Sequence, residues 1–309
     1  MAILITGGLG YIGSHIAKIA DEKIVIIDNQ SNSQINYKKN LPNAEVVLED
    51  LNYNNVCKIF KNYNINAVIH LAGSKSVQES IISPLEYYSN NVITSFELLK
   101  GMIEFNINKL IFSSSATVYG NTHPSPLRED FQTQYINPYG HTKIIIEEMI
   151  QNCCISYPNF CAVSLRYFNP IGAHQDGTLG DRPLGKPLNL MPLIIESIRG
   201  KKLTIFGNDY PTEDGTCLRD YIHVMDLAEA HLLCLNKFSK IKYENFNVGL
   251  GKGISVLELI RTFEAVNNVK VNYEFGQRRP GDASISYADN KKFIKNFKWS
   301  PKYDYSSMC

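Results

Sequence analysis

The chain has 309 residues, and its 31 Lys and Arg against 30 Asp and Glu leave a formal net charge of +1. Hydrophobic residues make up 44% and charged residues 20%, a globular balance that excludes disordered, collagen-like and coiled-coil chains. Near-neutral charge argues against nucleic acid or an anionic membrane surface as the main partner, because both require a clustered cationic excess. The length suits two lobes, or one large α/β unit with an appendage.

The cysteines and the N-terminal sequence indicate the cellular compartment of the protein. The seven cysteines include no C-x-x-C pair, so the sequence predicts no metal site and no regular disulfide framework. The run Met1–Thr6 has no basic residue and stops at Gly7, which is too short for the core of a signal peptide. No uninterrupted apolar stretch of about 18 residues occurs. We therefore expect a cytoplasmic protein that does not enter a membrane.

Short apolar runs in the first half of the chain are bounded by turn residues and rich in branched aliphatics, as buried strands are. They are Ile3–Thr6, Ile24–Ile27, Glu45–Leu48, Ala67–Leu71 and Leu110–Ser113. Helical stretches alternate with them at Ile12–Ala20, Asn55–Tyr63, Pro84–Phe105 and Tyr139–Gln151. This alternation predicts an α/β fold with a doubly wound parallel sheet. The Pro84–Phe105 helix places apolar Val92, Phe96, Leu99 and Ile103 near one face, for core packing or for a dimer seam.

The amino-acid composition and the pattern of predicted elements change after about residue 170. Residues 170–192 are rich in Gly, Pro, Asp and Asn and indicate a long irregular excursion. Short helices are predicted at Met191–Arg199, Leu227–Asn236 and Val256–Asn267, and strands at Leu203–Phe206 and Asn245–Val248. We expect a smaller mixed α/β lobe over 170–309 that packs against the carboxyl ends of the sheet, with segments near 220–250 returning to the first domain, 1–169.

A glycine-rich turn follows the first predicted strand and opens the first helix. Gly7, Gly8, Gly10 and Gly13 satisfy two overlapping dinucleotide-binding patterns, in which glycines let the backbone approach a pyrophosphate at a helix N-terminus. The next strand ends in Asp28, whose carboxylate accepts hydrogen bonds from ribose hydroxyls and repels a 2′-phosphate. The first domain is therefore predicted to be a Rossmann-type domain that binds NAD rather than NADP.

Two further strand ends lie on the expected dinucleotide path. Asp50 follows the third strand, where a carboxylate meets the adenine amino group, and Leu71, Ala72 and Gly73 follow the fourth.

A catalytic group is predicted where a helix begins after Asn137 and Pro138. Tyr139 and Lys143 lie one turn apart on one face of that helix. A tyrosine is a poor base at neutral pH because its pKa is near about 10. A nearby ammonium and the positive nicotinamide ring would stabilise the phenolate and lower that pKa. Ser115 ends a strand upstream, where the site should lie.

The glycine fingerprint, Ser115, Tyr139 and Lys143 resemble those of the extended short-chain dehydrogenase/reductase superfamily. Longer strings narrow the resemblance to its NAD-dependent epimerase/dehydratase branch and, within it, to the UDP-glucose 4-epimerase family, from Ala2 to about Trp299. These strings are FSSSATVYG at Phe112–Gly120, RYFNPIG at Arg166–Gly172, FGNDYPTEDG at Phe206–Gly215 and RDYIHVMDL at Arg219–Leu227.

The resemblance implies interconversion of UDP-glucose and UDP-galactose through a 4-keto sugar, with tightly held NAD. It implies that Tyr139 is the base at the sugar 4-hydroxyl, Ser115 the hydrogen-bond relay and Lys143 the residue that holds the nicotinamide ribose. The family's cofactor-contact positions correspond to Gly7, Gly10, Tyr11, Ile12, Gly13, Asp28, Asn29, Asn32, Asp50, Leu51, Leu71, Ala72, Gly73, Lys75, Asn90, Tyr139, Lys143 and Phe168.

The resemblance also implies a UDP-sugar site. Its positions correspond to Ser115, Asn169, Asn189, Leu190, Thr204, Ile205, Phe206, Arg219, Arg279–Asp282 and Ser286. Phe206 can stack on uracil, Arg219 and Arg279 can clamp the diphosphate, and Asp282 can accept a hydrogen bond from the ribose. With Lys75, these arginines would concentrate cations around phosphates that the net charge does not reveal. Ser286 stands where some family members carry a bulky aromatic residue, which implies additional activity on UDP-GlcNAc and UDP-GalNAc.

Two alternative functions remain at this stage. A sugar-nucleotide 4,6-dehydratase starts from the same oxidation but needs an acid and a base near C5 and C6, and Ser115-Ala116-Thr117 offers no carboxylate. A catalytically silent NAD-binding sensor or scaffold would not need Ser115, Tyr139 and Lys143. Relatives pair through two long helices, so the resemblance implies a homodimer, and they continue into a further helical segment beyond the residue that matches Cys309.

Overall fold

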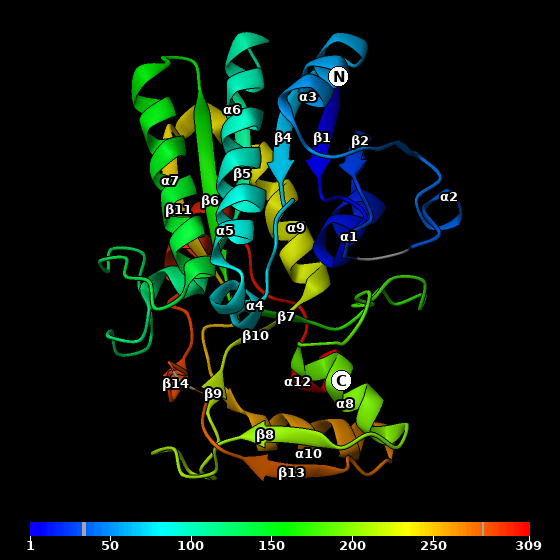
Figure 1. The fold of residues 1–309 in the computed structure, drawn as a ribbon, viewed down its shortest axis with the longest axis vertical. Helices are drawn as coiled ribbons and strands as arrows, with labels where there is room; N and C mark the ends of the chain where they lie inside the picture. The colour runs from blue at the N-terminus through cyan, green and yellow to red at the C-terminus, as the bar shows by residue number, and fades with distance from the viewer. Residues whose placement is uncertain (33–34, 280) are drawn as a thin grey trace.

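A seven-stranded parallel sheet forms the centre of the computed structural model, which describes residues 1–32, 35–279 and 281–309. Its strand order is β11-β6-β5-β4-β1-β2-β3. The strands are β1 Ala2–Thr6, β2 Lys23–Asp28, β3 Ala44–Leu48, β4 Ile65–His70, β5 Lys109–Ser115, β6 Cys161–Tyr167 and β11 Tyr243–Val248. The predicted doubly wound α/β fold is confirmed (Figure 1).

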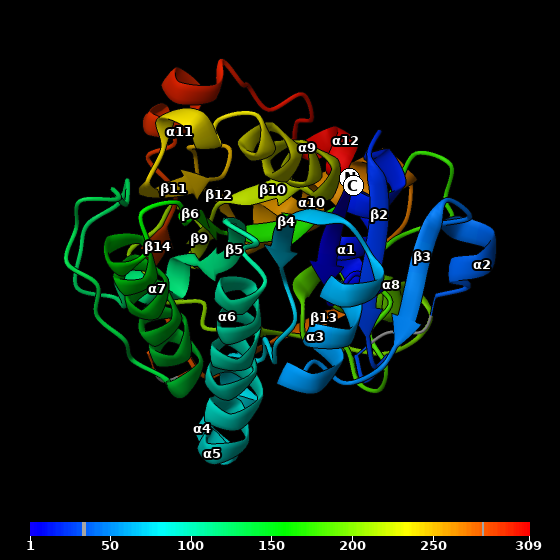
Figure 2. The ribbon, with the colours of Figure 1, turned by 90° about the horizontal axis from the view of Figure 1, so that it is seen from above.

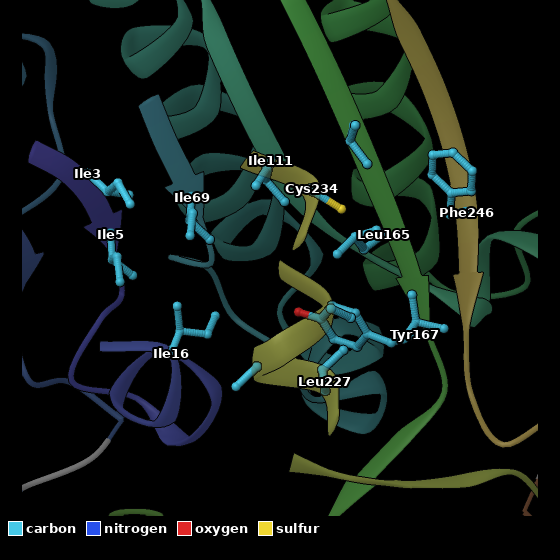
Figure 3. Packing of buried hydrophobic residues seen from close by; sticks show 14 of the residues in the cluster. Ile3, Ile5, Ile16, Ile69, Ile111, Leu165, Tyr167, Leu227, Cys234 and Phe246 are labelled. Carbon is cyan, nitrogen blue, oxygen red and sulfur yellow. The ribbon is translucent and has the colours of Figure 1, made fainter. Parts of the chain in front are cut away.

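Residues on each strand alternate between two hydrophobic cores, because successive side chains point to opposite faces of a sheet. In β1, Ile3 and Ile5 pack in one core with Ile16 of α1 and Leu227 of α9 (Figure 3). Leu4, between them, packs in the other core. Both faces of the sheet are therefore buried, which explains the nearly continuous apolar runs of its strands.

Helices cover both faces of the sheet (Figure 2). The first core receives α1 Tyr11–Ile19, α9 Val224–Leu235 and α11 Lys291–Phe297. The second receives α3 Tyr53–Asn62, α6 Thr94–Glu104 and α7 Pro138–Ser156. Shorter helices are α2 Tyr37–Asn40, α4 Val77–Ile82, α5 Pro84–Tyr87 and the single-turn 3-10 helices Ala116–Tyr119 and Phe238–Lys240.

A second group of elements lies beyond the carboxyl ends of the sheet strands (Figure 1). Its helices are α8 Leu190–Ile198, α10 Val256–Asn267 and α12 Tyr305–Met308. Its short strands are β7 Asn169–Ile171 paired with β10 Tyr221–His223, β8 Leu203–Phe206 paired with β13 Tyr273–Gly276, and β9 Leu218–Arg219 between β12 Ile254–Ser255 and β14 Ile285–Ser286. A separate apolar cluster includes Ile194, Leu203, Leu259 and Ile260.

The predicted single helix over Pro84–Phe105 is wrong in detail. A π-helical segment, Tyr88–Ile93, separates α5 from α6. Phe96, one of the side chains assigned to the apolar face, is 55% exposed, whereas Leu99 is buried. The extra residue of a π turn rotates the face that follows it, which the 3.6-residue period cannot anticipate.

The strand order reverses direction between β1 and β4, so their carboxyl ends frame the crevice in which doubly wound sheets bind ligands. No helix in the described ranges is both long and apolar enough to cross a membrane.

Candidate active site

One cavity of about 1110 Å³ lies between the carboxyl ends of the strands and the second group of elements. This volume is slightly above the range of typical ligand pockets, about 300–1,000 Å³, so it can hold more than one ligand moiety. All of the individually named candidate cofactor, substrate and catalytic residues line it. Within the range Arg279–Asp282, Pro280 lies outside the described residues.

The glycine-rich turn forms the floor of the cavity at the start of α1. Gly7 has a φ of +67°, and a Cβ there would lie 2.8 Å from the Ala72 nitrogen. A Cβ on Gly13 would lie 2.7 Å from the Gly7 oxygen. Gly10 at the N-cap has no side chain to bond the first N–H groups of α1, which leaves them to an anion. The turn therefore fits a pyrophosphate.

Acidic groups at the ends of β2 and β3 border the same floor. The Asp28 carboxylate accepts hydrogen bonds from the Leu9 nitrogen at 2.9 Å and the Gln30 nitrogen at 2.7 Å. Burial raises the pKa of Asp28 above its usual value, and these hydrogen bonds oppose the rise. Asn29 donates to Asp50 at 2.8 Å. The acceptors expected for ribose and adenine are thus held on neighbouring strand ends.

Ser115 and Tyr139 belong to different elements and meet inside the cavity. Ser115 is the last residue of β5, and its side chain hydrogen-bonds the Tyr139 side chain of α7. The Ser115 hydroxyl accepts from the Thr117 nitrogen at 3.2 Å and from the Thr117 hydroxyl at 3.0 Å. Its own proton therefore remains available for donation inside the cavity, to Tyr139 or to a ligand. Burial raises the pKa of Tyr139, and the Ser115 hydrogen bond acts against it.

Lys143 lies one turn after Tyr139 and is almost fully buried. Its Nζ donates to the Ser113 carbonyl at 2.8 Å and lies 5.7 Å from the centre of the Tyr139 ring. Burial lowers the pKa of Lys143 to about 8, while the charge of Glu147 raises it. The side chain is still a cation at neutral pH, next to the phenol it would have to stabilise as a phenolate.

The first turn of α7 is fixed by its cap. The buried Asn137 side chain accepts from the Gly140 nitrogen at 2.8 Å, and Pro138 occupies the first helical position. This cap fixes where α7 begins and therefore where Tyr139 lies relative to β5.

The opposite end of the cavity holds an aromatic ring with two arginines. The Arg279 guanidinium lies 4.8 Å from the centre of the Phe206 ring. Asp282 pairs with Arg279 at 2.9 Å and with Arg219 at 3.5 Å. Ser286 of β14 is the strand neighbour of Arg219 of β9 in their parallel pairing, so it lies beside this group. Two cations face one carboxylate, which leaves positive charge for an anionic ligand.

Asp181 is a cavity residue that the sequence did not predict. It accepts from Asn189 at 2.8 Å and lies 3.8 Å from the Lys75 ammonium. It belongs to the Gly- and Pro-rich segment 170–192, where no periodicity singles out a side chain. Its position in the sequence between Asn169 and Asn189, two predicted substrate contacts, was the only available signal. Across the described chain, no three His, Cys, Asp or Glu side chains are placed to hold a metal ion.

The arrangement can bind a dinucleotide at the glycine turn and a second anionic ligand near Phe206, with a hydroxyl, a phenol and an ammonium between them. Such a group can remove or return the proton of a substrate hydroxyl while the carbon that bears this hydroxyl exchanges a hydride with the dinucleotide.

Comparison with known proteins agrees with this geometry. Residues 3–249 match the sequence profile of the NAD dependent epimerase/dehydratase family. A UDP-glucose 4-epimerase of Bacillus subtilis is 43% identical over 321 residues, covering 100% of this chain and 95% of that protein.

Two solved structures are similar along the whole chain. A UDP-glucose 4-epimerase from Stenotrophomonas maltophila, with bound NAD and formylated UDP-arabinopyranose, has a TM-score of 0.96 and 38% identity, covering 100% of this chain and 96% of that one. A UDP-Glc/GlcNAc 4-epimerase from Campylobacter jejuni has a TM-score of 0.85 and 38% identity, with the same coverage. The glycine turn, the serine–tyrosine–lysine group and these similarities together show that the chain belongs to the NAD dependent epimerase/dehydratase family.

Proposed function

We propose that this chain is an NAD-dependent 4-epimerase that interconverts UDP-glucose and UDP-galactose through a 4-keto sugar. The observation that carries the proposal is the placement of Ser115, Tyr139 and Lys143 between a dinucleotide floor and an arginine-rich end of one cavity. Relatives of this length and similarity are named UDP-glucose 4-epimerase.

NAD fits the residues present. The glycine turn would hold the pyrophosphate, Asp28 the adenosine ribose, Asp50 the adenine and Lys143 the nicotinamide ribose. Bound NAD supplies a hydride acceptor that becomes the donor in the second half of the reaction. The carboxylate of Asp28 favours NAD over NADP because a 2′-phosphate would be repelled.

Tyr139 would take the proton from the sugar 4-hydroxyl, with Ser115 donating to the same oxygen. In the chain alone, burial keeps the pKa of Tyr139 above its usual value, in contrast to the lowered pKa predicted from the sequence. The Lys143 ammonium and the positive nicotinamide ring would together stabilise the phenolate. The 4-keto sugar would then turn over in the cavity and regain its proton from Tyr139.

The UDP moiety would occupy the Phe206 end. Phe206 offers a ring for uracil, and Arg219 and Arg279 offer forked donors for the diphosphate. Because Arg279 covers the Phe206 ring and both arginines pair with Asp282, binding would require these groups to exchange partners.

Ser286 gives this site room for a 2-acetamido group, so UDP-GlcNAc and UDP-GalNAc would also be substrates. Ser286 lines the cavity beside Arg219, and a similar solved structure is a UDP-Glc/GlcNAc 4-epimerase.

The two alternatives are less well supported. A dehydratase needs a carboxylate next to the hydroxyl residue, and Ala116 and Thr117 follow Ser115 here. A silent sensor would not need the buried Lys143 ammonium, whose desolvation is costly.

A coupled assay tests the proposal. Purified protein incubated with UDP-galactose and no added NAD should form UDP-glucose, because we expect the cofactor to copurify. After the reaction is stopped, the UDP-glucose is measured with UDP-glucose dehydrogenase and the NAD that this second enzyme needs. A protein that holds NAD and converts neither the hexose nor the acetamido substrate would support the sensor; a 4-keto-6-deoxy product would support the dehydratase.

We also propose a cytoplasmic homodimer in which residues 1–169 form the NAD-binding domain and 170–309 mainly the substrate lobe, with segments near 220–250 returning to the first domain. Large exposed apolar side chains on the α4–α7 helices suit a dimer surface: Ile82, Leu85, Ile93, Phe96 and Ile155. Analytical ultracentrifugation tests the dimer, limited proteolysis the domain division, and cell fractionation the compartment.

A further inference from the structure

A buried polar network lies directly behind the catalytic group and has no role in the steps above. We define it as Ser114, Tyr119, Glu147, Arg166 and Asn247. Arg166 and Glu147 have side chains 3% and 6% exposed and pair at 2.5 Å. A second bond joins Arg166 Nε to Glu147 Oε1 at 2.9 Å, which makes the pair bidentate.

The network joins the elements that carry the catalytic residues. Ser114 of β5 donates to Glu147 Oε1 at 2.5 Å. Its neighbours are Ser113, whose carbonyl holds Lys143, and Ser115. Successive strand residues face opposite ways, so Ser114 reaches α7 while Ser115 reaches the cavity. Glu147 thus fixes the end of β5 against α7 from the side away from the substrate.

Arg166 extends the network to β6 and beyond. It donates to the Tyr119 hydroxyl at 3.1 Å, and that hydroxyl donates to Asn247 of β11 at 2.7 Å. A buried ion pair is weak evidence for stability, because desolvation offsets its attraction. The buried Arg166–Glu147 pair is better explained by the relative positions that it enforces on β5, β6 and α7.

We propose that Glu147 is a positioning residue for the 4-epimerase reaction: it sets Ser115 against Tyr139 by holding β5 to α7, and it places a buried negative charge one helical turn from the Lys143 ammonium. This inference rests on the proposed function for its kinetic part only.

The surroundings of Lys143 make Glu147 the relevant charge. Lys143 faces Tyr139 and Glu147 on its own helix, the Phe112 ring and Ser113 carbonyl on β5, and His70 on β4. His70 is neutral because burial lowers its pKa to about 3. Glu147 itself faces Ser114, Arg166 and, through its carbonyl, the Tyr243 hydroxyl of β11. Removing the Glu147 charge would therefore let burial lower the pKa of Lys143 further.

The test substitutes Glu147→Gln, which keeps the shape and removes the charge. Glu148→Gln is the matched control, since Glu148 is the next residue of α7 and is exposed. The pKa of Lys143 is read in the protein as purified from the ¹³Cε shift of labelled lysine, assigned by its absence in Lys143→Met. We expect a lower pKa in Glu147→Gln and an unchanged one in Glu148→Gln.

Kinetics give the second readout. Glu147→Gln should lower kcat about tenfold at neutral pH with little change in KM, and move the alkaline limb of kcat to lower pH. Ser114→Ala removes one donor and keeps the charge, so it should lower kcat without moving the limb. Ile150→Val, a destabilising change in the core beneath α7, should neither lower kcat nor move the alkaline limb.

An unchanged Lys143 pKa in a folded Glu147→Gln protein would overturn the charge part, and wild-type kcat in both Glu147→Gln and Ser114→Ala would overturn the positioning part. If Glu147→Gln fails to fold, Ser114→Ala still decides the positioning part. The double variant Glu147→Met/Arg166→Leu, which replaces the buried ion pair with apolar side chains, then decides the charge part by a lowered or an unchanged Lys143 pKa. A wild-type protein without epimerase activity contradicts the proposed function and leaves the Lys143 titration to decide this inference.

Discussion

Among single residues, Tyr139 is the one proposed to move the proton. Tyr139→Phe keeps the ring and removes the acid–base oxygen, so kcat should fall by about 10²–10⁴. NAD should remain bound, because the glycine turn and Asp28 are untouched. The coupled assay and the absorbance of bound cofactor measure both; full activity in Tyr139→Phe would assign the proton to another group.

Lys143 should carry a stability cost for its catalytic position. Lowering its pKa from 10.5 to about 8 costs the folded state roughly 3 kcal/mol while the side chain is charged. Lys143→Met removes that cost and forfeits about 1 kcal/mol for the bond to Ser113. The inactive variant should therefore be more stable at neutral pH by about 2 kcal/mol.

The sign of the pH dependence follows from the lowered pKa. The cost is complete below pH 8 and disappears as pH rises toward 10.5, where lysine is neutral in both the folded and unfolded states. The stability difference between the two proteins should shrink over that range. Urea unfolding at several pH values measures it, and a wild type that is the more stable protein at neutral pH would contradict the burial argument.

Ser286 should set the tolerance for the 2-acetamido group. Ser286→Tyr would fill the cavity beside Arg219 and should abolish activity on UDP-GalNAc while sparing UDP-galactose. The ratio of kcat/KM for the two substrates is the measurement. Equal loss of both activities would show that the side chain disturbs the site generally and has no selective role.

Residues with a motif could be predicted from the sequence, and residues that act through packing could not. Gly7, Asp28 and Tyr139 each stand at a fixed distance from a strand end or a helix start, which is a local property. Glu147 and Asp181 each have a partner far away in the sequence, Ser114 for Glu147 and Lys75 for Asp181. Only the folded chain brings those partners together.

At the scale of elements, the start of α7 controls the position of Tyr139. Asn137→Ala removes the cap and leaves the buried Gly140 nitrogen without its acceptor. We expect a loss of about 1–2 kcal/mol in unfolding free energy, together with a lower kcat. Asn137→Asp keeps the acceptor and should retain most of both; comparable losses in the two variants would argue against the cap.

The long elements were predictable because they repeat a hydrophobic period, as in Val256–Asn267, found as predicted. β6 was missed because Ser164 and Arg166 are buried polar residues that break its apolar run. β9, β12 and β14 have two residues each, too few for a period to show. The π-helical turn at Tyr88–Ile93 rotates the apolar face of α6 away from the position that a regular 3.6-residue period predicts.

For the molecule as a whole, the net charge of +1 conceals a cavity with its own charges. Lys75, Arg219 and Arg279 all line that cavity, as predicted, and each lies close to an aspartate there. Composition could not reveal these cations; the resemblance predicted their clustering, and the fold places all three in one cavity.

The central claim is that hydrogen leaves C4 of the sugar and returns to the same carbon within one site. The direct measurement follows UDP-galactose carrying deuterium at C4, incubated with the purified protein and no added NAD. We predict UDP-glucose that retains the deuterium at C4, shown by mass spectrometry and NMR. Product that has lost the label to solvent, or no product from protein that holds NAD, would contradict the account.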